Sequence, residues 1–372
     1  MENRMHPDYS AQLAEKNARL QNLLAPFDAP APEVFASPPQ HYRMRAEFRM
    51  WHDGNEICYA MFERGQKAAT ASLIRLQQFP AAAESINALM PRLLAAVRGD
   101  AVLRERLYQC EFLATLSGDM LITLIYHKKL GDDWTAAAQR LQDDLGIALI
   151  GRSRGQKIVL KRDFVTESLK VNGETLHYRQ IEGGFSQPNA LVCEKMLAWA
   201  SDCAQHLGGD LLELYCGNGN FTVPLSRRFR RVLATELSKT SVKAAQWNLA
   251  TNSADNVQLA RLSAEELAQA FTGERVFRRL AEQNIDLSDF DFSTVFVDPP
   301  RAGVDNDTLK LLADFDNILY ISCNPHSLAD NLKQLCATHR VVRSALFDQF
   351  PFTEHIECGV CLQRKTAESI VD

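Results

Sequence analysis

The 372-residue sequence lacks any long run of apolar residues. No stretch approaches the roughly 18 uninterrupted apolar residues that a membrane-spanning helix needs, so we expect no membrane partner. Residues 1–7 contain no apolar signal-peptide core, and we therefore expect a cytoplasmic protein. An apolar fraction of 46% and a charged fraction of 23% are ordinary for a globular enzyme of two domains or one large one.

The sequence also lacks the cysteine pattern of a disulfide-rich or metal-binding protein. Its nine cysteines, an odd number at irregular spacing, favour reduced thiols over a disulfide framework. Cys358 and Cys361 form a CxxC pair, but no second pair completes a four-thiolate site. Alternation along a strand would place these two side chains on opposite faces. We therefore interpret the pair as structural and expect neither a metal ion nor an iron–sulfur cluster.

An overall positive charge, which would mark a general nucleic-acid binder, is absent, because the net charge is −5. The cations are nevertheless clustered. Residues 151–162 hold five cations and no acid, residues 227–231 hold four arginines, and Arg43, Arg45 and Arg49 lie among Tyr and Phe. Each cluster alone is more typical of a solvated face. Together they could form a local phosphate-binding patch on an acidic protein.

Two regions of different character follow each other along the chain. Residues 1–180 alternate helical and paired-strand patterns, which predicts an α+β domain with antiparallel strands. Between residues 175 and 190 the pattern changes to strand–helix alternation, which predicts an α/β domain over residues 181–372. Its seven expected strands are Leu211–Tyr215, Val232–Thr235, Val257–Ala260, Thr294–Val297, Ile318–Ser322, Val341–Phe347 and Ile356–Leu362.

A glycine-containing turn follows the first of these strands. Gly217 and Gly219 permit a tight turn and a close approach of a ligand to the backbone. Glu236 ends the next strand about 20 residues on, where a carboxylate binds the ribose hydroxyls of an adenine nucleoside. A dinucleotide would require a third glycine where Thr222 stands, so the pattern favours S-adenosylmethionine over NAD.

Two further strand ends carry side chains that are candidates for catalysis. Asp298 follows an apolar strand, and the stiff Pro299-Pro300 turn directs it and Arg301 toward the cleft. Cys323 ends the next strand, before an Asn-Pro break. Most lone cysteines are buried and inert, so this thiol alone would favour core packing. Its position beside the other two motifs favours chemistry instead.

The motifs Glu213-Leu-Tyr-Cys-Gly-Asn-Gly-Asn-Phe221, Val297-Asp-Pro-Pro-Arg301, Ile321-Ser-Cys-Asn-Pro325 and His355-Ile-Glu-Cys-Gly359 together resemble the RNA uracil-5-methyltransferase family. The similarity extends through the N-terminal region, including His41-Tyr-Arg-Met-Arg-Ala-Glu-Phe-Arg49, and is strongest to the bacterial branch that acts on tRNA. It implies a class I, Rossmann-like methyltransferase domain with seven strands, the last antiparallel, behind an N-terminal RNA-binding domain. It also implies S-adenosylmethionine-dependent methylation at C5 of the T-loop uridine, with the similar arm of tmRNA as a further candidate substrate, by a monomer.

The resemblance assigns Cys323 as the nucleophile that adds to C6 of uracil and Glu357 as the acceptor of the C5 proton. An antiparallel last strand would bring Glu357 to the same sheet edge as Cys323. Cationic or dipolar neighbours should favour the Cys323 thiolate, with Arg301 and the helix starting near Ser327 as candidates. The roles of Asp298 and Arg301 stay open between substrate and cofactor.

The remaining contacts are also implied by the resemblance. Residues expected to bind S-adenosylmethionine are Gln187, Tyr215, Asn220, Glu236 and Asp298. Residues expected to bind RNA are Arg49, Tyr108 and Phe185, the last by stacking on a flipped base. Two alternatives are a uracil methyltransferase acting on ribosomal RNA, whose relatives usually carry a four-cysteine cluster, and a non-catalytic module that opens the T loop.

Overall fold

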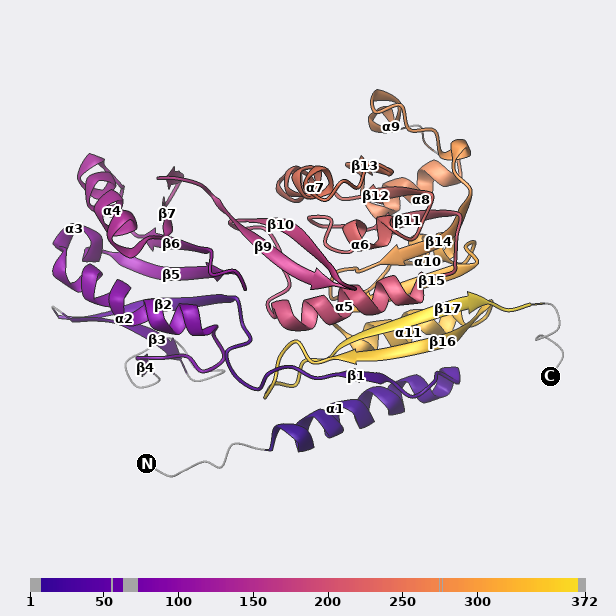
Figure 1. Ribbon diagram of the computed structural model, residues 1–372, viewed down its shortest axis with the longest axis horizontal. Helices are drawn as coiled ribbons and strands as arrows, with labels where there is room; N and C mark the ends of the chain where they lie inside the picture. The colour runs from indigo at the N-terminus through magenta and orange to yellow at the C-terminus, as the bar shows by residue number, and fades with distance from the viewer. Residues whose placement is uncertain (1–7, 55, 63–72, 274, 276, 367–372) are drawn as a thin grey trace.

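The computed structural model describes residues 8–54, 56–62, 73–273, 275 and 277–366. Residues 1–7, on which the expected cytoplasmic location depends, lie outside this part. Two lobes, each built on a β-sheet, lie side by side, and a hairpin runs between them (Figure 1). Within the described residues, no helix is both long and apolar enough for a membrane span.

The first lobe is a seven-stranded sheet with strand order β4-β3-β2-β5-β6-β7-β8. The strands are β2 (Arg45–Asp53), β3 (Glu56–Phe62), β4 (Leu73–Leu76), β5 (Leu107–Ala114), β6 (Met120–Tyr126), β7 (Ala148–Ser153) and β8 (Gln156–Val159). Every pair is antiparallel except β6 and β7, which α4 connects. The helices of this lobe are α2 (Glu84–Gly99), α3 (Ala101–Arg104) and α4 (Asp132–Leu145). The lobe agrees with the predicted α+β organisation.

The second lobe contains all seven strands expected in residues 181–372. They are β11 (Asp210–Leu214), β12 (Arg231–Thr235), β13 (Val257–Ala260), β14 (Phe292–Val297), β15 (Asn317–Ser322), β16 (His339–Phe347) and β17 (Glu357–Arg364). They lie in the order β16-β17-β15-β14-β11-β12-β13, and β17 is antiparallel to both of its neighbours. The predicted α/β class with an antiparallel last strand is confirmed.

Helices cover both faces of this sheet (Figure 1). They are α5 (Ala190–Cys203), α6 (Thr222–Ser226), α7 (Lys239–Thr251), α8 (Ala264–Phe271), α9 (Arg278–Glu282), α10 (Asn306–Leu312) and α11 (Pro325–Leu335). Single-turn 3₁₀ helices occupy Ala25–Phe27 and Leu287–Asp289. The strands are apolar on both faces because both are buried, as expected of a parallel sheet.

The beginning of the chain packs on the second lobe. Strand β1 (Glu33–Phe35) adds an eighth strand parallel to β16, and helix α1 (Tyr9–Leu24) lies along the same lobe (Figure 1). Lys16 of α1 forms a buried ion pair with Asp348, with Nζ and Oδ1 2.8 Å apart. The position of neither element could be predicted from local sequence, because each contacts residues more than 300 positions away.

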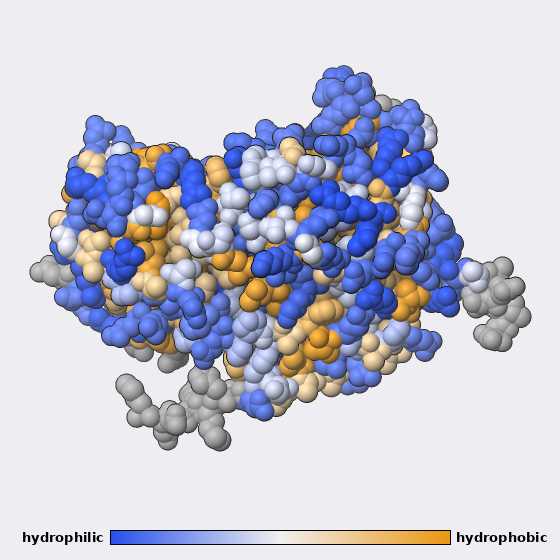
Figure 2. All heavy atoms as spheres, in the orientation of Figure 1, coloured by the Kyte–Doolittle hydropathy of each residue, from blue (hydrophilic) through white to orange (hydrophobic). Residues whose placement is uncertain are grey.

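The hairpin of β9 (Phe164–Val171) and β10 (Glu174–Ile181) connects the lobes, and the domain division at residue 180 stays a prediction. On the face shown in Figure 2, hydrophilic side chains cover most of both lobes, and hydrophobic side chains gather near the middle.

Candidate active site

A pocket of about 660 Å³ lies at the carboxyl ends of β11, β14 and β15, the edge where parallel α/β sheets bind ligands. Most of the predicted site residues line it. They are Gln187, Tyr215, Gly217, Asn220, Glu236, Asp298, Arg301, Cys323, Glu357 and Phe185. Gly219 belongs to the same loop without lining the pocket, and Arg49 and Tyr108 line a separate hollow.

Residues in the loop after β11 adopt left-handed backbone conformations. Gly217 and Gly219 have φ angles of 57° and 79°, as the tight turn predicts. Tyr215 also has a positive φ, 59°, which is uncommon for an aromatic residue and is typical of functional sites. The Glu236 carboxylate fixes the loop by accepting the Gly217 N–H at 3.0 Å. The loop therefore presents its backbone and the Tyr215 ring to the pocket.

The other side of the loop is tied to the connecting hairpin and to α5. The Tyr178 hydroxyl donates to the Asn220 carbonyl at 3.0 Å. The Asn220 amide donates to Cys193 Sγ at 3.3 Å. Because these bonds come from β10 and α5, the position of Asn220 depends on how the hairpin and α5 pack against the second lobe.

Strand pairing brings Cys323 and Glu357 to one edge. Ser322 at the end of β15 pairs with Cys358 of β17, so the residue after Ser322 and the residue before Cys358 are neighbours at the mouth of the sheet. Glu357 is buried at 5% exposure, whereas Cys323 is exposed toward the pocket. The expected juxtaposition of these two residues is present, and Cys323 directly follows the buried strand β15, as expected.

The loops that carry Arg301 and Cys323 are joined to each other. The Asn324 side chain caps α11 by accepting the His326 N–H, and its amide donates to the Arg301 carbonyl at 3.1 Å. Helix α11 thus begins two residues after the thiol, as predicted for the region near Ser327.

The pocket is electrostatically unfavourable for a thiolate. Burial, followed by the carboxyl groups of Glu357 and Asp298, raises the pKa of Cys323 to about 11, and Arg301 opposes this only weakly. Arg301 lowers the pKa of the thiol, in the expected direction, but burial and the two carboxyl groups outweigh it in the protein alone. The carboxyl groups are affected in the same direction, because burial raises the pKa of Asp298 to about 7 and holds that of Glu357 well above its usual range.

A second candidate site lies in the first lobe, in a hollow of about 290 Å³. The Arg49 guanidinium lies over the Tyr108 ring, 3.2 Å from its centroid. His127 stacks on Tyr108 with 4.0 Å between ring centroids. His52 and Arg106 also line the hollow. Sequence reasoning missed His127, which directly follows β6 and lies beside the irregularity in β5 at Tyr108.

The basic clusters that the sequence contains lie in different environments in the fold. Arg43 and Arg45 line the pocket although they belong to the first lobe. The four arginines of residues 227–231 instead contact the protein itself, as Arg230 does in its ion pair with the buried Asp210, with Nη2 and Oδ2 2.7 Å apart. These arginines therefore contribute to the structure, and their part in a phosphate-binding patch stays a prediction.

The structure also joins Cys203 of α5 to Cys361 of β17 as a disulfide, which contradicts the expectation of reduced thiols throughout. The other cysteine of the CxxC pair, Cys358, is buried, free and on the opposite face of the strand, as predicted. Within the described residues, no group of three or more His, Cys, Asp or Glu side chains could hold a metal ion.

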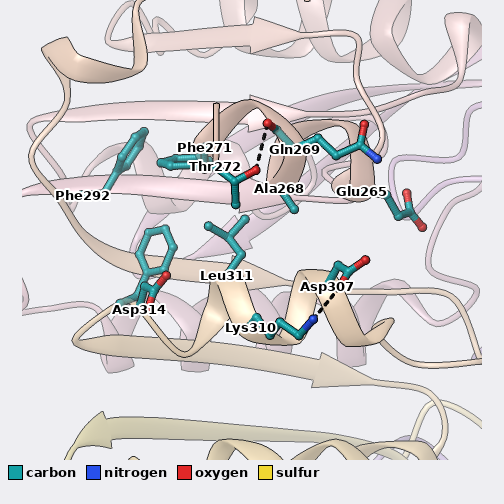
Figure 3. Close-up of a pocket in the computed structure, with 11 residues that line it drawn as sticks. Glu265, Ala268, Gln269, Phe271, Thr272, Phe292, Asp307, Lys310, Leu311 and Asp314 are labelled. Atoms are coloured by element: carbon teal, nitrogen blue, oxygen red, sulfur yellow. Dashed lines mark hydrogen bonds and ion pairs between the residues drawn. The ribbon is translucent and has the colours of Figure 1, made fainter. Parts of the chain in front are cut away.

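Another pocket, of about 400 Å³, opens between α8 and α10 (Figure 3). The two helices form facing walls of this pocket. Glu265 and Gln269 of α8 lie opposite Asp307 and Lys310 of α10. None of the predicted site residues lines it. We assign it no function.

Comparisons with known proteins agree with this geometry. A family model described as tRNA (Uracil-5-)-methyltransferase matches residues 8–365. A tRNA/tmRNA (uracil-C(5))-methyltransferase from Neisseria meningitidis is 62% identical over 96% of this chain and 99% of its own. A protein of the same name from Acinetobacter baylyi is 57% identical over 96% and 99%.

Among solved structures, the tRNA (uracil-54, C5)-methyltransferase of Pyrococcus abyssi, in complex with S-adenosyl-L-homocysteine, has a similar fold. The TM-score is 0.73 over 95% of this chain and 83% of that one, at 20% sequence identity. The family model and the close relatives cover nearly the whole chain, and the chain therefore belongs to the tRNA (uracil-5-)-methyltransferase family.

Proposed function

We propose that the protein transfers a methyl group from S-adenosylmethionine to C5 of a uridine in tRNA, and also acts on tmRNA. The names of the Neisseria and Acinetobacter relatives support both RNAs. The T-loop uridine is the target we infer, since the name of the Pyrococcus neighbour specifies uracil 54. In this chain, the observation that best supports the proposal is one pocket lined by Cys323, Asp298, Glu357 and the glycine loop.

The pocket fits the cofactor in size and in chemistry. Its volume of about 660 Å³ lies within the usual range for a site that binds a small molecule. Bound there, S-adenosylmethionine would supply an electrophilic methyl group on its sulfonium. We infer that Gln187, Tyr215, Asn220 and Glu236 hold it, with Gly217 and Gly219 shaping the loop and Asp298 at the shared boundary with the uracil.

The thiol of Cys323 is needed because C5 of uracil is a poor nucleophile. Addition of Cys323 Sγ to C6 forms a carbon–sulfur bond and converts the ring into an enolate, whose C5 then attacks the methyl group. Glu357 takes the C5 proton, and the returning electron pair expels Cys323 as a thiolate. A raised pKa makes the ionised Glu357 carboxylate a stronger base, so it suits this step once its own proton has left, which the positive charge of a bound cofactor would favour.

Formation of the thiolate needs a proton acceptor, because the thiol pKa of about 11 keeps Cys323 protonated at neutral pH. Asp298, with a pKa of about 7, is partly ionised there and lines the same pocket. We infer that Asp298 either accepts this proton or bonds the uracil imide, and that Arg301 faces the enolate oxygen.

We assign RNA binding to the first lobe, which forms most of the expected domain over residues 1–180, and catalysis to residues 181–372. Arg49 and Tyr108 form a stacked basic surface suited to an unstacked base, and Phe185, 68% exposed at the pocket, is placed to stack on a flipped uracil. All these residues come from one chain, so the site needs no partner subunit, and we infer a monomer. From the tRNA substrate we infer a cytoplasmic location.

The test is a covalent trap. T-arm RNA carrying 5-fluorouracil cannot lose a proton from C5, so wild type with S-adenosylmethionine should form an adduct that survives denaturation. Cys323→Ala should form none, whereas Cys336→Ala, at a half-buried cysteine outside the pocket, should form it normally. Methylation of ordinary tRNA at C5 by Cys323→Ala would overturn the proposed mechanism.

A further inference from the structure

Gln180 carries a buried amide that the proposed reaction does not use. It lies on β10 with 9% of its surface exposed, and it lines the active-site pocket. Within the described residues, its Oε1 atom is buried and has no hydrogen-bond partner. Buried polar groups without partners are rare and costly in folded proteins. An unpaired amide oxygen in the wall of a pocket points to a ligand that supplies the missing donor.

Contacts on both faces of β10 fix the position of this amide. On the face that carries Gln180, the Tyr178 hydroxyl donates a hydrogen bond to the glycine-containing loop after β11. On the opposite face, the Arg179 guanidinium lies between the rings of Phe164 and Trp247, 4.2 Å and 4.1 Å from their centroids. The unpaired oxygen therefore belongs to a strand that is held firmly in place.

Strand β10 leads from the inferred cofactor site toward the inferred base site. Tyr178 contacts the cofactor loop, and Gln180 is the next residue along the same face of the strand. The turn that follows leads to Phe185, which is 68% exposed at the pocket. Arg45 fixes this turn, since its Nη2 donates to the Gly184 carbonyl at 2.8 Å. Along the chain, the amide lies between the cofactor loop and the ring placed to stack on a flipped uracil.

The polar edge of uracil is complementary to a glutamine amide. The amide provides an acceptor oxygen and an NH₂ donor. The imide edge of uracil presents N3–H between two carbonyl oxygens. The Gln180 Oε1 atom would accept N3–H while Nε2 donates to one of these carbonyls. Enzymes that flip a base out of its stack read it through hydrogen bonds to this edge.

We propose that Gln180 binds the imide edge of the flipped uracil and so contributes to selection of the target base. The inference rests on the proposed function and adds a recognition residue to it. With the imide bound by Gln180, Asp298 is left for the other role inferred for it, which is to accept the proton of Cys323. The contact to N3–H is present before and after the thiol adds to C6. It therefore strengthens RNA binding more than it accelerates the chemical step.

The test compares wild type with Gln180→Met, which keeps the length of the side chain but has no amide. Filter binding measures the affinity for three T-arm RNAs, with uridine, dihydrouridine or an abasic ribose at the target position. Dihydrouridine keeps the imide edge but lacks the C5–C6 double bond to which the thiol adds. The variant should bind the first two RNAs about tenfold more weakly, as loss of a buried hydrogen bond predicts, and the abasic RNA less than about threefold more weakly.

Two further measurements separate the base from the cofactor and from the chemical step. The affinity for S-adenosylhomocysteine, measured by calorimetry, should change less than about threefold in Gln180→Met. In steady-state methylation, the KM for T-arm RNA should rise about tenfold in this variant, and kcat should stay within about threefold.

The melting temperature shows whether the amide is structural. An unpaired buried amide lowers the stability of the free protein, so Gln180→Met should keep or raise the melting temperature. Gln142→Met is the matched control, because Gln142 is 4% exposed, lies in α4 outside the pocket and accepts the Leu149 N–H at 3.2 Å. The control should lower the melting temperature and leave RNA affinity unchanged.

One measurement needs no variant. T-arm RNA with 3-methyluridine at the target position has no N3–H, and wild type should bind it at least about tenfold more weakly than the uridine RNA.

Four results would overturn the inference. They are unchanged affinity of Gln180→Met for the uridine RNA, equal weakening of all three RNAs, a loss of S-adenosylhomocysteine affinity as large as the loss of RNA affinity, and equal binding of uridine and 3-methyluridine RNA by wild type. The third result would assign the amide to the cofactor instead. Failure of wild type to form the 5-fluorouracil adduct would overturn the proposed function itself, and the inference with it.

Discussion

The pKa of Cys323 gives a quantitative prediction about the free protein. The thiol pKa is raised to about 11, whereas an unperturbed cysteine titrates near about 8.5. At pH 8 the thiolate fraction is then about 0.001, against about a quarter for an ordinary thiol. Since the thiolate is the reactive form, alkylation of Cys323 should be about 200-fold slower than that of an ordinary thiol at this pH.

The assay is alkylation by iodoacetamide between pH 7 and 11, followed by mass spectrometry of the peptide that contains Cys323. The rate should rise about tenfold per pH unit over most of this range, whereas glutathione levels off above about pH 9. Glu357→Gln removes one carboxyl group that raises the thiol pKa and should increase the rate at pH 8 severalfold. Glu354→Gln, at an exposed glutamate outside the pocket, is the control and should not.

A rate that levels off below pH 9 would refute the reasoning. It would mean that the start of α11, or Arg301, stabilises the thiolate more than burial and the two carboxyl groups oppose it. The nucleophile would then be ready in the free protein, as expected from the sequence.

Three other predictions concern stability and RNA binding. Lys16→Met leaves Asp348 buried without its partner and should lower the free energy of unfolding by about 3–5 kcal/mol in denaturant titrations; a loss below about 1 kcal/mol would contradict the pairing. Burial raises the pKa of Glu167 to about 7 from 4.5, so its stabilising proton is lost as pH rises through 7, costing up to about 3 kcal/mol. Wild type should therefore lose thermal stability relative to Glu167→Gln between pH 5 and pH 8, and parallel curves would contradict this. Arg49→Ala removes the cation over Tyr108 and should weaken T-arm RNA about tenfold in filter binding, with cofactor affinity unchanged; equal loss of both would indicate a structural defect instead.

Local patterns in the sequence were sufficient to predict the strands of the second lobe, because each is a short apolar run bounded by polar or glycine-containing turns. They also placed Asp298 and Cys323 correctly, since the ends of neighbouring parallel strands share one edge. The resemblance identified Glu357, and the β15–β17 register accounts for its position next to Cys323.

The parts that could not be predicted depend on contacts between distant residues. Strand β1 pairs with β16 only in the folded chain, and Asp210 is what makes Arg230 structural. The raised pKa of the Cys323 thiol has the same origin. Glu357 and Asp298, which are distant from it in sequence, raise this pKa, and Arg301 lowers it less.

These neighbours suggest why an acidic pocket suits the proposed reaction. Burial keeps Cys323 protonated and Asp298 only partly ionised in the free protein at neutral pH. A ligand with positive charge lowers the pKa of every acid near it, so it favours the carboxylates and the thiolate together. The thiol would then become nucleophilic only when the methyl donor is present. A pocket rich in lysine would activate Cys323 earlier, but it would expose a reactive thiolate to oxidation and would repel the sulfonium.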